Sequence, residues 1–188
     1  MRKLVEITFM SIDGVIDDPD IVVEAEPYFS SSEEQDYQER WLSSADALLL
    51  GRKTYENFSQ AYLQMADEGK GAPMDFVNRM NSIPKYVASK TLSEASWNAT
   101  VIQGDISDEV RKIKKQSGKN IIKYGTGPLD QILMRDKLVD VLCVVIYPFV
   151  LGHGTHLLEG LGVTEHWQLS NVKHFASGTV VLELVPKT

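Results

Sequence analysis

Three short segments of the sequence combine glycine, hydroxyl and basic side chains, the residue types that bind phosphate groups. They are Gly51-Arg52-Lys53-Thr54, Ser89-Lys90-Thr91 and Gly125-Thr126-Gly127. Glycine lets a phosphate approach the backbone closely, and the free amides at the start of a helix attract anions. Arg52 and Lys90 would add charge-assisted hydrogen bonds of roughly 1.5–3 kcal/mol each. One such segment is common in any protein, whereas three together favour a site for a phosphorylated ligand.

Each of the three segments follows a predicted strand, over residues 47–50, 85–88 and 120–124. Helices are expected directly after the first and third segments, over residues 52–65 and 129–135. In a parallel sheet the carboxyl ends of the strands meet at one edge, where ligands bind. We therefore expect the three segments to lie side by side.

Strand and helix signals alternate along the rest of the chain. Further strands are predicted over residues 2–10, 100–103 and 139–147, with helices over 33–44, 75–81 and 107–116 and a loop over 13–20. Overlapping capping boxes at Ser30/Glu33 and Ser31/Glu34 open the first of these helices. A hairpin over 168–175 and 179–185 ends the chain. The pattern predicts one α/β domain over residues 1–188, a three-layer sandwich of helices on both faces of a mainly parallel sheet with an antiparallel edge.

The charge of the chain is regional. The net charge is −7, yet residues 4–39 hold eleven acids and no Lys or Arg, while residues 40–188 are slightly basic. Such a distribution gives no footprint for nucleic acid, and the lysines of residues 112–119 are interpreted as a solvated helix face. No nucleic-acid partner is expected.

The longest apolar run, residues 141–151, is too short to cross a bilayer, which takes about 20 residues. The single cysteine, Cys143, lies inside that run and is interpreted as a packing residue. A cytoplasmic protein with no membrane partner is the expectation.

Several familiar chemistries are excluded by their missing motifs. The chain has no C-x-x-C, H-E-x-x-H, P-loop or G-x-S-x-G sequence. His153 and His156 lie in a glycine loop with no third ligand nearby, so no metal site is expected. The Rossmann fingerprint is also missing, because Asp130 stands where the third glycine of a G-x-G-x-x-G run from Gly125 would fall.

The chain resembles the dihydrofolate-reductase-like superfamily, and more closely the reductase domain of the bifunctional riboflavin-biosynthesis deaminase-reductase and its standalone bacterial relatives. The similar segments are SIDG at 11–14, ADALLLGRKTYE at 45–56, PKYVASKTL at 84–92, GTGPL at 125–129, LVD at 138–140 and PFVLGHG at 148–154. They follow the order of the family from residue 8 to about residue 160. The zinc deaminase half has no counterpart, because H-x-E and P-C-x-x-C are both missing.

The resemblance implies NADPH as the hydride donor. It places Gly51, Arg52 and Thr54 against cofactor phosphates and assigns Ser89, Lys90 and Thr91 to the adenosine 2′-phosphate. Gly125, Thr126 and Gly127 would form the turn beside the pyrophosphate and the nicotinamide. The small-molecule substrate would be of pterin, pyrimidine or ribosyl type and would accept the hydride at a C=N or C=O group.

The substrate-side residues implied by the resemblance are two carboxylates. Dihydrofolate reductases carry one on the helix before G-R-x-T; counting back from Gly51 reaches the neighbourhood of Gln35, where Asp36 is the best match. The SIDG segment brings Asp13 to the mouth of the site, although an Asp before Gly14 is also an ordinary turn former. Three functions stay open. The first is an NADPH-dependent reductase, with a homodimer through the C-terminal strands as a family expectation. The others are a non-catalytic NADPH- or nucleotide-binding regulatory protein and a protein of unrelated function on a similar α/β fold.

Overall fold

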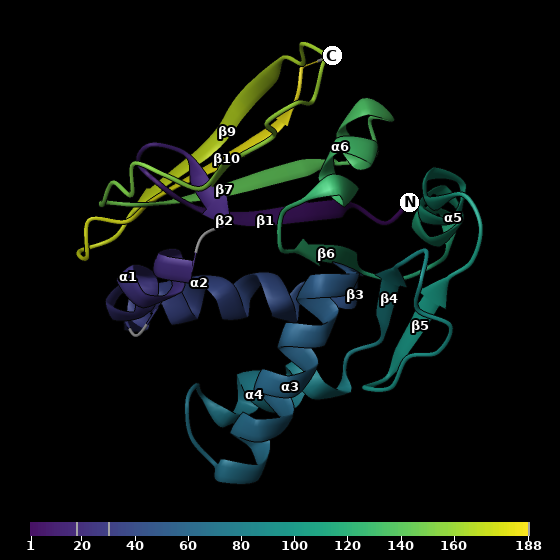
Figure 1. Cartoon of the computed structure of the whole chain (residues 1–188), viewed down its shortest axis with the longest axis horizontal. Coiled ribbons are helices and arrows are strands. Elements are labelled where there is room, and N and C mark those ends of the chain that lie inside the picture. The colour runs from purple at the N-terminus through teal and green to yellow at the C-terminus, as the bar shows by residue number, and fades with distance from the viewer. Residues whose placement is uncertain (18, 30, 188) are drawn as a thin grey trace.

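A computed structural model describes residues 1–17, 19–29 and 31–187. An eight-stranded sheet lies at its centre in the order β5-β4-β3-β6-β1-β7-β10-β9 (Figure 1). The strands are β1 (Leu4–Ser11), β3 (Ala45–Gly51), β4 (Lys85–Ala88), β5 (Ala99–Ile102), β6 (Asn120–Tyr124), β7 (Val141–Tyr147), β9 (Trp167–His174) and β10 (Val180–Pro186). The strands β5, β4, β3, β6, β1 and β7 are parallel to one another. Strand β10 is antiparallel to β7, and β9 is antiparallel to β10. The predicted sheet is confirmed.

Helices cover both faces of the sheet, as predicted (Figure 1). They are α1 (Pro19–Phe29), α2 (Ser32–Ser43), α3 (Arg52–Glu68), α4 (Met74–Ser82), α5 (Ile106–Lys115) and α6 (Pro128–Arg135). On one face Leu48 and Leu50 belong to a core that includes side chains of α2, α3 and α4. On the other face Leu49 packs in a separate core with α5 and α6. The apolar run of β3 is thus buried on both sides, which is why it lacks polar alternation.

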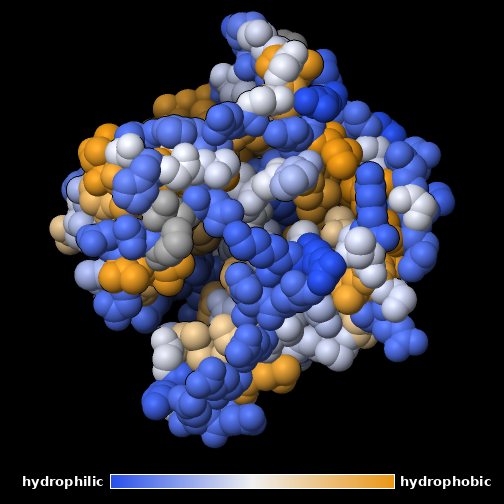
Figure 2. All heavy atoms as spheres, in the orientation of Figure 1, coloured by the Kyte–Doolittle hydropathy of each residue, from blue (hydrophilic) through white to orange (hydrophobic). Residues whose placement is uncertain are grey.

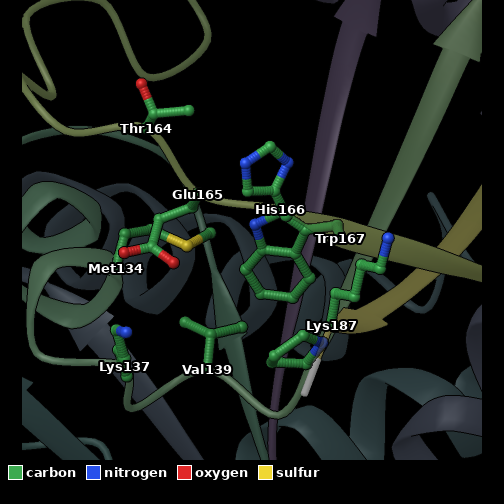
Figure 3. A pocket seen from close by; sticks show the side chains of 9 residues that line it. Met134, Lys137, Val139, Thr164, Glu165, His166, Trp167 and Lys187 are labelled. Carbon is green, nitrogen blue, oxygen red and sulfur yellow. The ribbon is translucent and has the colours of Figure 1, made fainter.

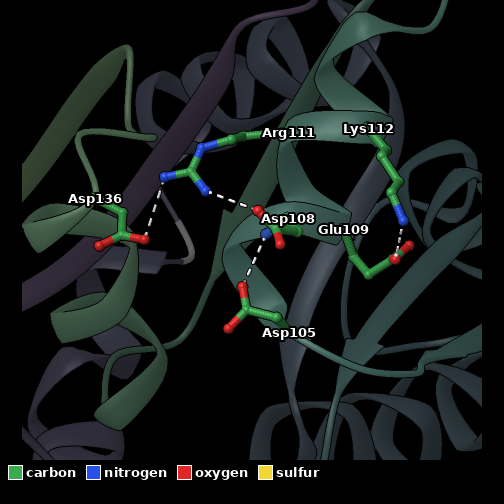
Figure 4. Close-up of polar contacts among 6 residues, drawn as sticks. All are labelled: Asp105, Asp108, Glu109, Arg111, Lys112 and Asp136. Carbon is green, nitrogen blue, oxygen red and sulfur yellow. Dashed lines mark hydrogen bonds and ion pairs between the residues drawn. The ribbon is translucent and has the colours of Figure 1, made fainter.

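Local signals set several of the helix ends. Ser31 Oγ accepts a hydrogen bond from Glu34 N at 3.3 Å and caps α2, while the Ser30 box lies outside the described residues. Asp105 caps α5 by accepting from Asp108 N at 3.0 Å. Arg111 then joins Asp108 of α5 to Asp136 after α6, at 3.1 and 3.3 Å (Figure 4).

The predicted loop over residues 13–20 is wrong in part. Its middle forms β2 (Val15–Asp17), which pairs with β8 (Thr155–His156), and α1 follows within two residues. The sequence obscures this helix because Val22 and Val23 are exposed and Pro27 lies inside it. Among its described side chains, Ile21 and Ala25, one turn apart, are the buried apolar ones, and Tyr28 and Phe29 pack partly buried against the core.

Candidate functional site

The ends of neighbouring parallel strands bring the three phosphate-type segments to one edge of the sheet. They follow β4, β3 and β6, which are adjacent in the sheet order. Strand β1 lies next to β6 and ends at the same edge. The predicted juxtaposition is confirmed, and its contacts define the site from the backbone outward.

The turn after β4 contacts the start of α3 through Arg52. The guanidinium of Arg52 donates to Thr91 Oγ1 at 2.6 Å and to Glu56 Oε1 at 2.7 Å. Ser89 Oγ shapes the turn by accepting from the backbone N of Thr91 and Leu92, at 3.2 and 3.0 Å, and Lys90 is exposed between them. A basic and hydroxyl-rich surface therefore joins two of the three segments.

Gly125 lies directly against Thr54. Its φ is +75°, and a Cβ placed on Gly125 would overlap the Oγ1 of Thr54. The next residue, Thr126, shares a 2.7 Å hydrogen bond with Thr8 of β1. The turn after β6 thus packs between α3 and β1, and glycine is the residue that its backbone and its close contact both permit.

These segments fit the phosphates of a nucleotide cofactor. Gly51 is the N-cap of α3 and carries no side chain that could cap its first amides, which leaves them available to an anion. Arg52 and Lys90 supply positive charge beside that helix end.

A buried ionic cluster lies beneath the turn of Gly125 to Gly127. Lys123 Nζ forms an ion pair with Asp130 and donates to Gly125 O, and Asp130 Oδ2 accepts from Gly127 N at 2.5 Å. Glu6, opposite Lys123 in the β1–β6 register, lies 4.0 Å from its Nζ. Burial lowers the pKa of Lys123 to about 8, against the opposing effect of Glu6. The cluster fixes the turn from below and was missed in the sequence, although a lysine within an apolar strand signals a buried ion.

An apolar pocket of about 450 Å³ lies beside this edge. Six aromatic side chains, Phe9, Phe29, Phe58, Tyr62, Phe76 and Tyr124, line it together with Val22, Glu26, Gln35, Gln38, Glu39, Ala61, Met65, Gly71, Ala72 and Pro73. It continues from the cofactor-type segments, because Tyr124 precedes Gly125 and Phe58 follows Thr54 by one helical turn. Figure 2 shows hydrophilic residues over most of the face in view, with separate hydrophobic patches between them.

Asp36, the α2 carboxylate that the resemblance implies, is not part of the pocket lining. Asp36 is exposed and does not line the pocket, whereas its neighbour Gln35 does. Glu34, on the other side of Gln35, is buried and accepts from Tyr147 OH at 2.8 Å. Burial raises the pKa of Glu34, and the hydrogen bond from Tyr147 opposes that rise.

Asp13 joins two loops of the site edge. Its Oδ1 accepts from Ser11 Oγ at 2.6 Å and from Leu151 N at 3.2 Å, and its Oδ2 accepts from Gly152 N at 2.7 Å. These hydrogen bonds, led by that of Ser11, lower the pKa of Asp13 to about 2. The carboxylate therefore binds the loop after β7 to the loop after β1.

Asp13→Asn is expected to lower the thermal stability at neutral pH, because the amide keeps only one of the two acceptor oxygens. The folded pKa of about 2 lies below the ordinary 3.8, so the stabilisation is present above the ordinary value and is lost as the pH falls through about 2. Thermal unfolding should separate the two proteins at pH 7 and bring them together in strong acid. A loss of turnover with unchanged stability would contradict this role and place Asp13 among the catalytic groups.

A second hollow of about 250 Å³ lies at the opposite edge of the sheet, where β7 begins and β10 ends (Figure 3). Met134, Val139, Trp167 and the side chains of Glu165 and His166 surround it. It is remote from the glycine turns, because the parallel strands begin rather than end there. Among the described residues there is no group of three His, Cys, Asp or Glu side chains arranged to hold a metal ion, and no helix long and apolar enough to span a bilayer.

The fold and the edge site together define a reductase-type domain of dihydrofolate-reductase-like architecture. The chain belongs to the RibD C-terminal domain family, whose sequence profile matches residues 2–181. The uncharacterized protein YyaP of Bacillus subtilis (strain 168) is 32% identical over 140 residues, which cover 74% of this chain and 73% of YyaP.

Solved structures share the fold at lower sequence identity. A candidate riboflavin biosynthesis protein from Shewanella sp. PV-4 matches with a TM-score of 0.72 and 17% identity over 99% of both chains. The diaminohydroxyphosphoribosylaminopyrimidine deaminase/5-amino-6-(5-phosphoribosylamino)uracil reductase of Thermotoga maritima matches with 0.65 and 14%, over 99% of this chain and 57% of its own. The resemblance noted in the sequence is confirmed, and the family supports a reductase of the riboflavin-pathway type.

Proposed function

We propose that the protein is an NADPH-dependent reductase that transfers a hydride to a C=N or C=O group of a small pterin-, pyrimidine- or ribosyl-type molecule. One observation carries the proposal: the Arg52–Thr91 contact and the close approach of Gly125 to Thr54 lie on one sheet edge that continues into an apolar pocket. Phosphate-type and ring-type surfaces are thus adjacent, as hydride transfer between a dinucleotide and a small ring requires.

The residues of the edge divide the work of binding. Arg52, Ser89, Lys90 and Thr91 would hold the 2′-phosphate, and the amides after Gly51 with the Thr54 hydroxyl would meet the diphosphate. The turn of residues 125–127 would align the nicotinamide with the pocket. The cofactor supplies the hydride, and the aromatic walls keep water from the reacting atoms.

Proton delivery calls for a carboxylic acid at the pocket. The sequence proposes Asp36, which is exposed outside the lining. Glu39 is the α2 carboxylate that does line the pocket, so we propose Glu39 for this role. Glu39→Gln would then lower turnover and leave cofactor binding intact.

Gln35 lines the pocket near the position where the resemblance implies a carboxylate, and an amide cannot deliver a proton. This favours a second candidate function, a non-catalytic NADPH- or nucleotide-binding regulatory protein. Oxidation of NADPH, followed by its absorbance with dihydrofolate, a ribosylaminopyrimidine phosphate and a panel of carbonyl and imine compounds, separates the two. Turnover establishes the reductase. Tight NADPH binding without turnover by any acceptor supports the regulatory protein.

Arg52→Ala is expected to weaken NADPH binding by about ten- to a hundredfold and NADH binding far less, because one strong charged contact is lost. Lys53→Ala is the matched control. Lys53 is next to Arg52 in the sequence, but its ammonium pairs with the exposed Asp17 at 2.9 Å rather than with Thr91. Calorimetric titration of both cofactors measures the difference. Equal losses for NADPH and NADH would remove Arg52 from the 2′-phosphate.

We propose further that residues 1–188 act as one domain and form a homodimer through the outer strand β9. Leu169 and Val172 of that strand are each 50% exposed, which is unusual for apolar side chains on an edge. The free thiol of Cys143 is buried and suits a reducing compartment, so we place the reaction in the cytoplasm.

A further inference from the structure

The charges of the apolar pocket are of one sign. Among the residues that the structure describes, its lining includes no Lys, Arg or His, and its two carboxyl side chains are Glu26 and Glu39. A buried phosphate needs a cationic partner or several hydrogen-bond donors to offset its loss of hydration. The pocket therefore does not suit a phosphorylated substrate.

Three bases near the pocket are engaged with other partners, two with carboxylates and one with a backbone carbonyl. Arg40 of α2 pairs with Glu183 at 2.6 Å, and Lys70, which precedes Gly71 of the lining, pairs with Glu68 at 3.1 Å. Arg79 of α4 donates to Ala45 O at 2.7 Å. A phosphate in the pocket would have to compete for these side chains, so they do not change the preference.

The aromatic side chains of the pocket contact one another edge to face or tilted and keep part of their ring surface exposed. Phe58 lies with its ring centroid 5.5 Å from that of Tyr62 and 6.0 Å from that of Tyr124, at interplanar angles of 81° and 55°. Across the pocket lining, Phe9 and Phe29 meet edge to face at 5.4 Å. Phe9, Phe29, Phe58 and Tyr62 are only partly buried, which leaves ring surface for a ligand.

Tyr124 adds a polar group that lacks a hydrogen-bond partner in the described part of the chain. Its hydroxyl is buried and makes no hydrogen bond to the described residues. Burial raises the pKa of Tyr124, so the hydroxyl stays protonated and can donate. A buried hydroxyl left unpaired is costly, and a ring nitrogen or carbonyl oxygen of a ligand would satisfy it once the side chains that cover the hydroxyl move aside. The amides of Gln35 and Gln38 on α2 provide both donors and acceptors for the same ring.

We propose that the substrate of this reductase is a flat, non-phosphorylated nitrogen heterocycle, uncharged or cationic, bound in the aromatic pocket with Tyr124 and Gln35 as its polar anchors. The inference rests on the proposed function, because it takes the pocket beside the cofactor edge as the substrate site. It separates this chain from the 5-phosphoribosyl substrate named for the Thermotoga maritima enzyme.

Two ligand pairs that differ only in a phosphate test the proposal. They are 5-amino-6-(ribosylamino)uracil with its 5′-phosphate, and 6-hydroxymethylpterin with its phosphate ester, titrated calorimetrically into the full chain with and without NADPH. In at least one pair the phosphate-free ring should bind at least about tenfold more tightly than its ester. Equal or tighter binding of both esters overturns the inference, and so does the failure of both phosphate-free rings to bind. Failure of NADPH to bind overturns the proposed function instead, while the titrations without NADPH still decide the charge preference.

Two variants test the named residues. Tyr124→Phe should leave the stability unchanged or raised, since it deletes an unpaired hydroxyl, and should weaken the phosphate-free ring about five- to twentyfold. Tyr86→Phe, on β4 outside the lining, is the control. Gln38→Lys supplies the missing cation and should improve the ester relative to the phosphate-free ring by about tenfold. Unchanged ring affinity in Tyr124→Phe, or an unchanged preference in Gln38→Lys, contradicts the proposal.

Discussion

Replacing Asp130 by alanine is expected to lower the free energy of unfolding by about 3–5 kcal/mol, the usual cost of removing one partner from a buried ion pair. Lys123 and Asp130 side chains are each 1% exposed, so the ammonium left behind cannot recover its hydration. Glu6, 4.0 Å away, is too distant to replace the direct contact. The amide of Gly127 also loses its acceptor. Urea denaturation with linear extrapolation measures the change.

Asp136→Ala is the matched control for this prediction. Asp136 follows the same helix and pairs with Arg111 in the open, where an ion pair contributes only about 0–1 kcal/mol (Figure 4). The triple change Asp130→Leu, Lys123→Met and Glu6→Met should recover stability, because no charge of the cluster then stays buried alone. A loss below about 1 kcal/mol in Asp130→Ala would show that this pair contributes no more than a surface pair.

Asp130→Ala also tests whether the buried ionic cluster holds the turn of residues 125–127 in place for the proposed cofactor. Lys123 donates to Gly125 O and Asp130 accepts from Gly127 N, so the pair holds both ends of the turn proposed to align the nicotinamide. The two residues are positioning residues that act through the backbone. The fraction that stays folded at low temperature should therefore bind NADPH more weakly, which separates positioning from stability alone.

The strands that precede the three phosphate-type segments were predictable because strong local signals mark where each strand ends. Strands β4 and β6 match residues 85–88 and 120–124, since each is a short apolar run closed by a polar or glycine turn. Their parallel order follows from the strand–helix alternation, which requires crossover connections. The three phosphate-type segments could therefore be placed at one edge before any contact was known.

The pocket was not predictable in the same way. Its aromatic side chains come from β1, α1, α3, α4 and β6, and no motif links them along the chain. They gather only when the tertiary packing forms. The helix register of α2 was also undetermined: Glu34 and Tyr37 turn inward, toward Tyr147 and Glu183, and this rotation leaves Gln35 at the pocket and Asp36 in solvent. That rotation is set by hydrogen bonds between α2 and the strands β7 and β10. The sequence of the helix alone therefore does not reveal it.

The acidic segment of residues 4–39 contributes carboxylates to the apolar pocket. The base-free segment includes α1 and the part of α2 before Arg40, which contribute Glu26 and Glu39 to the pocket, whereas Arg52 and Lys90 lie after it. In the proposed function, the anion-binding surface and the acidic pocket would share one sheet edge. A charged cofactor and a phosphate-free ring would then be directed to different halves of it.

Gly125→Ala is expected to weaken NADPH binding by at least about a hundredfold, because both the backbone and the packing of the turn oppose a methyl group there. A φ of +75° costs an alanine roughly 1–2 kcal/mol, and overpacking against Thr54 adds about 1–3 kcal/mol. The turn or α3 must shift to relieve the overlap, and either movement displaces groups assigned to the diphosphate. Calorimetry with NADPH and thermal unfolding measure the two effects.

Gly69→Ala isolates the contribution of the contact. Gly69 ends α3 at a φ of +65°, and a Cβ there would meet nothing within 4 Å, so the variant has the backbone cost without the overlap. It should lose stability to a smaller extent and keep its NADPH affinity. Thr54→Ser combined with Gly125→Ala should recover little, because the overlapping oxygen remains, whereas Thr54→Gly with Gly125→Ala removes the overlap and should restore stability in part. If Gly125→Ala bound NADPH as tightly as the wild type, the turn after β6 could not lie against the cofactor, and the nicotinamide would have to approach the pocket from another strand end.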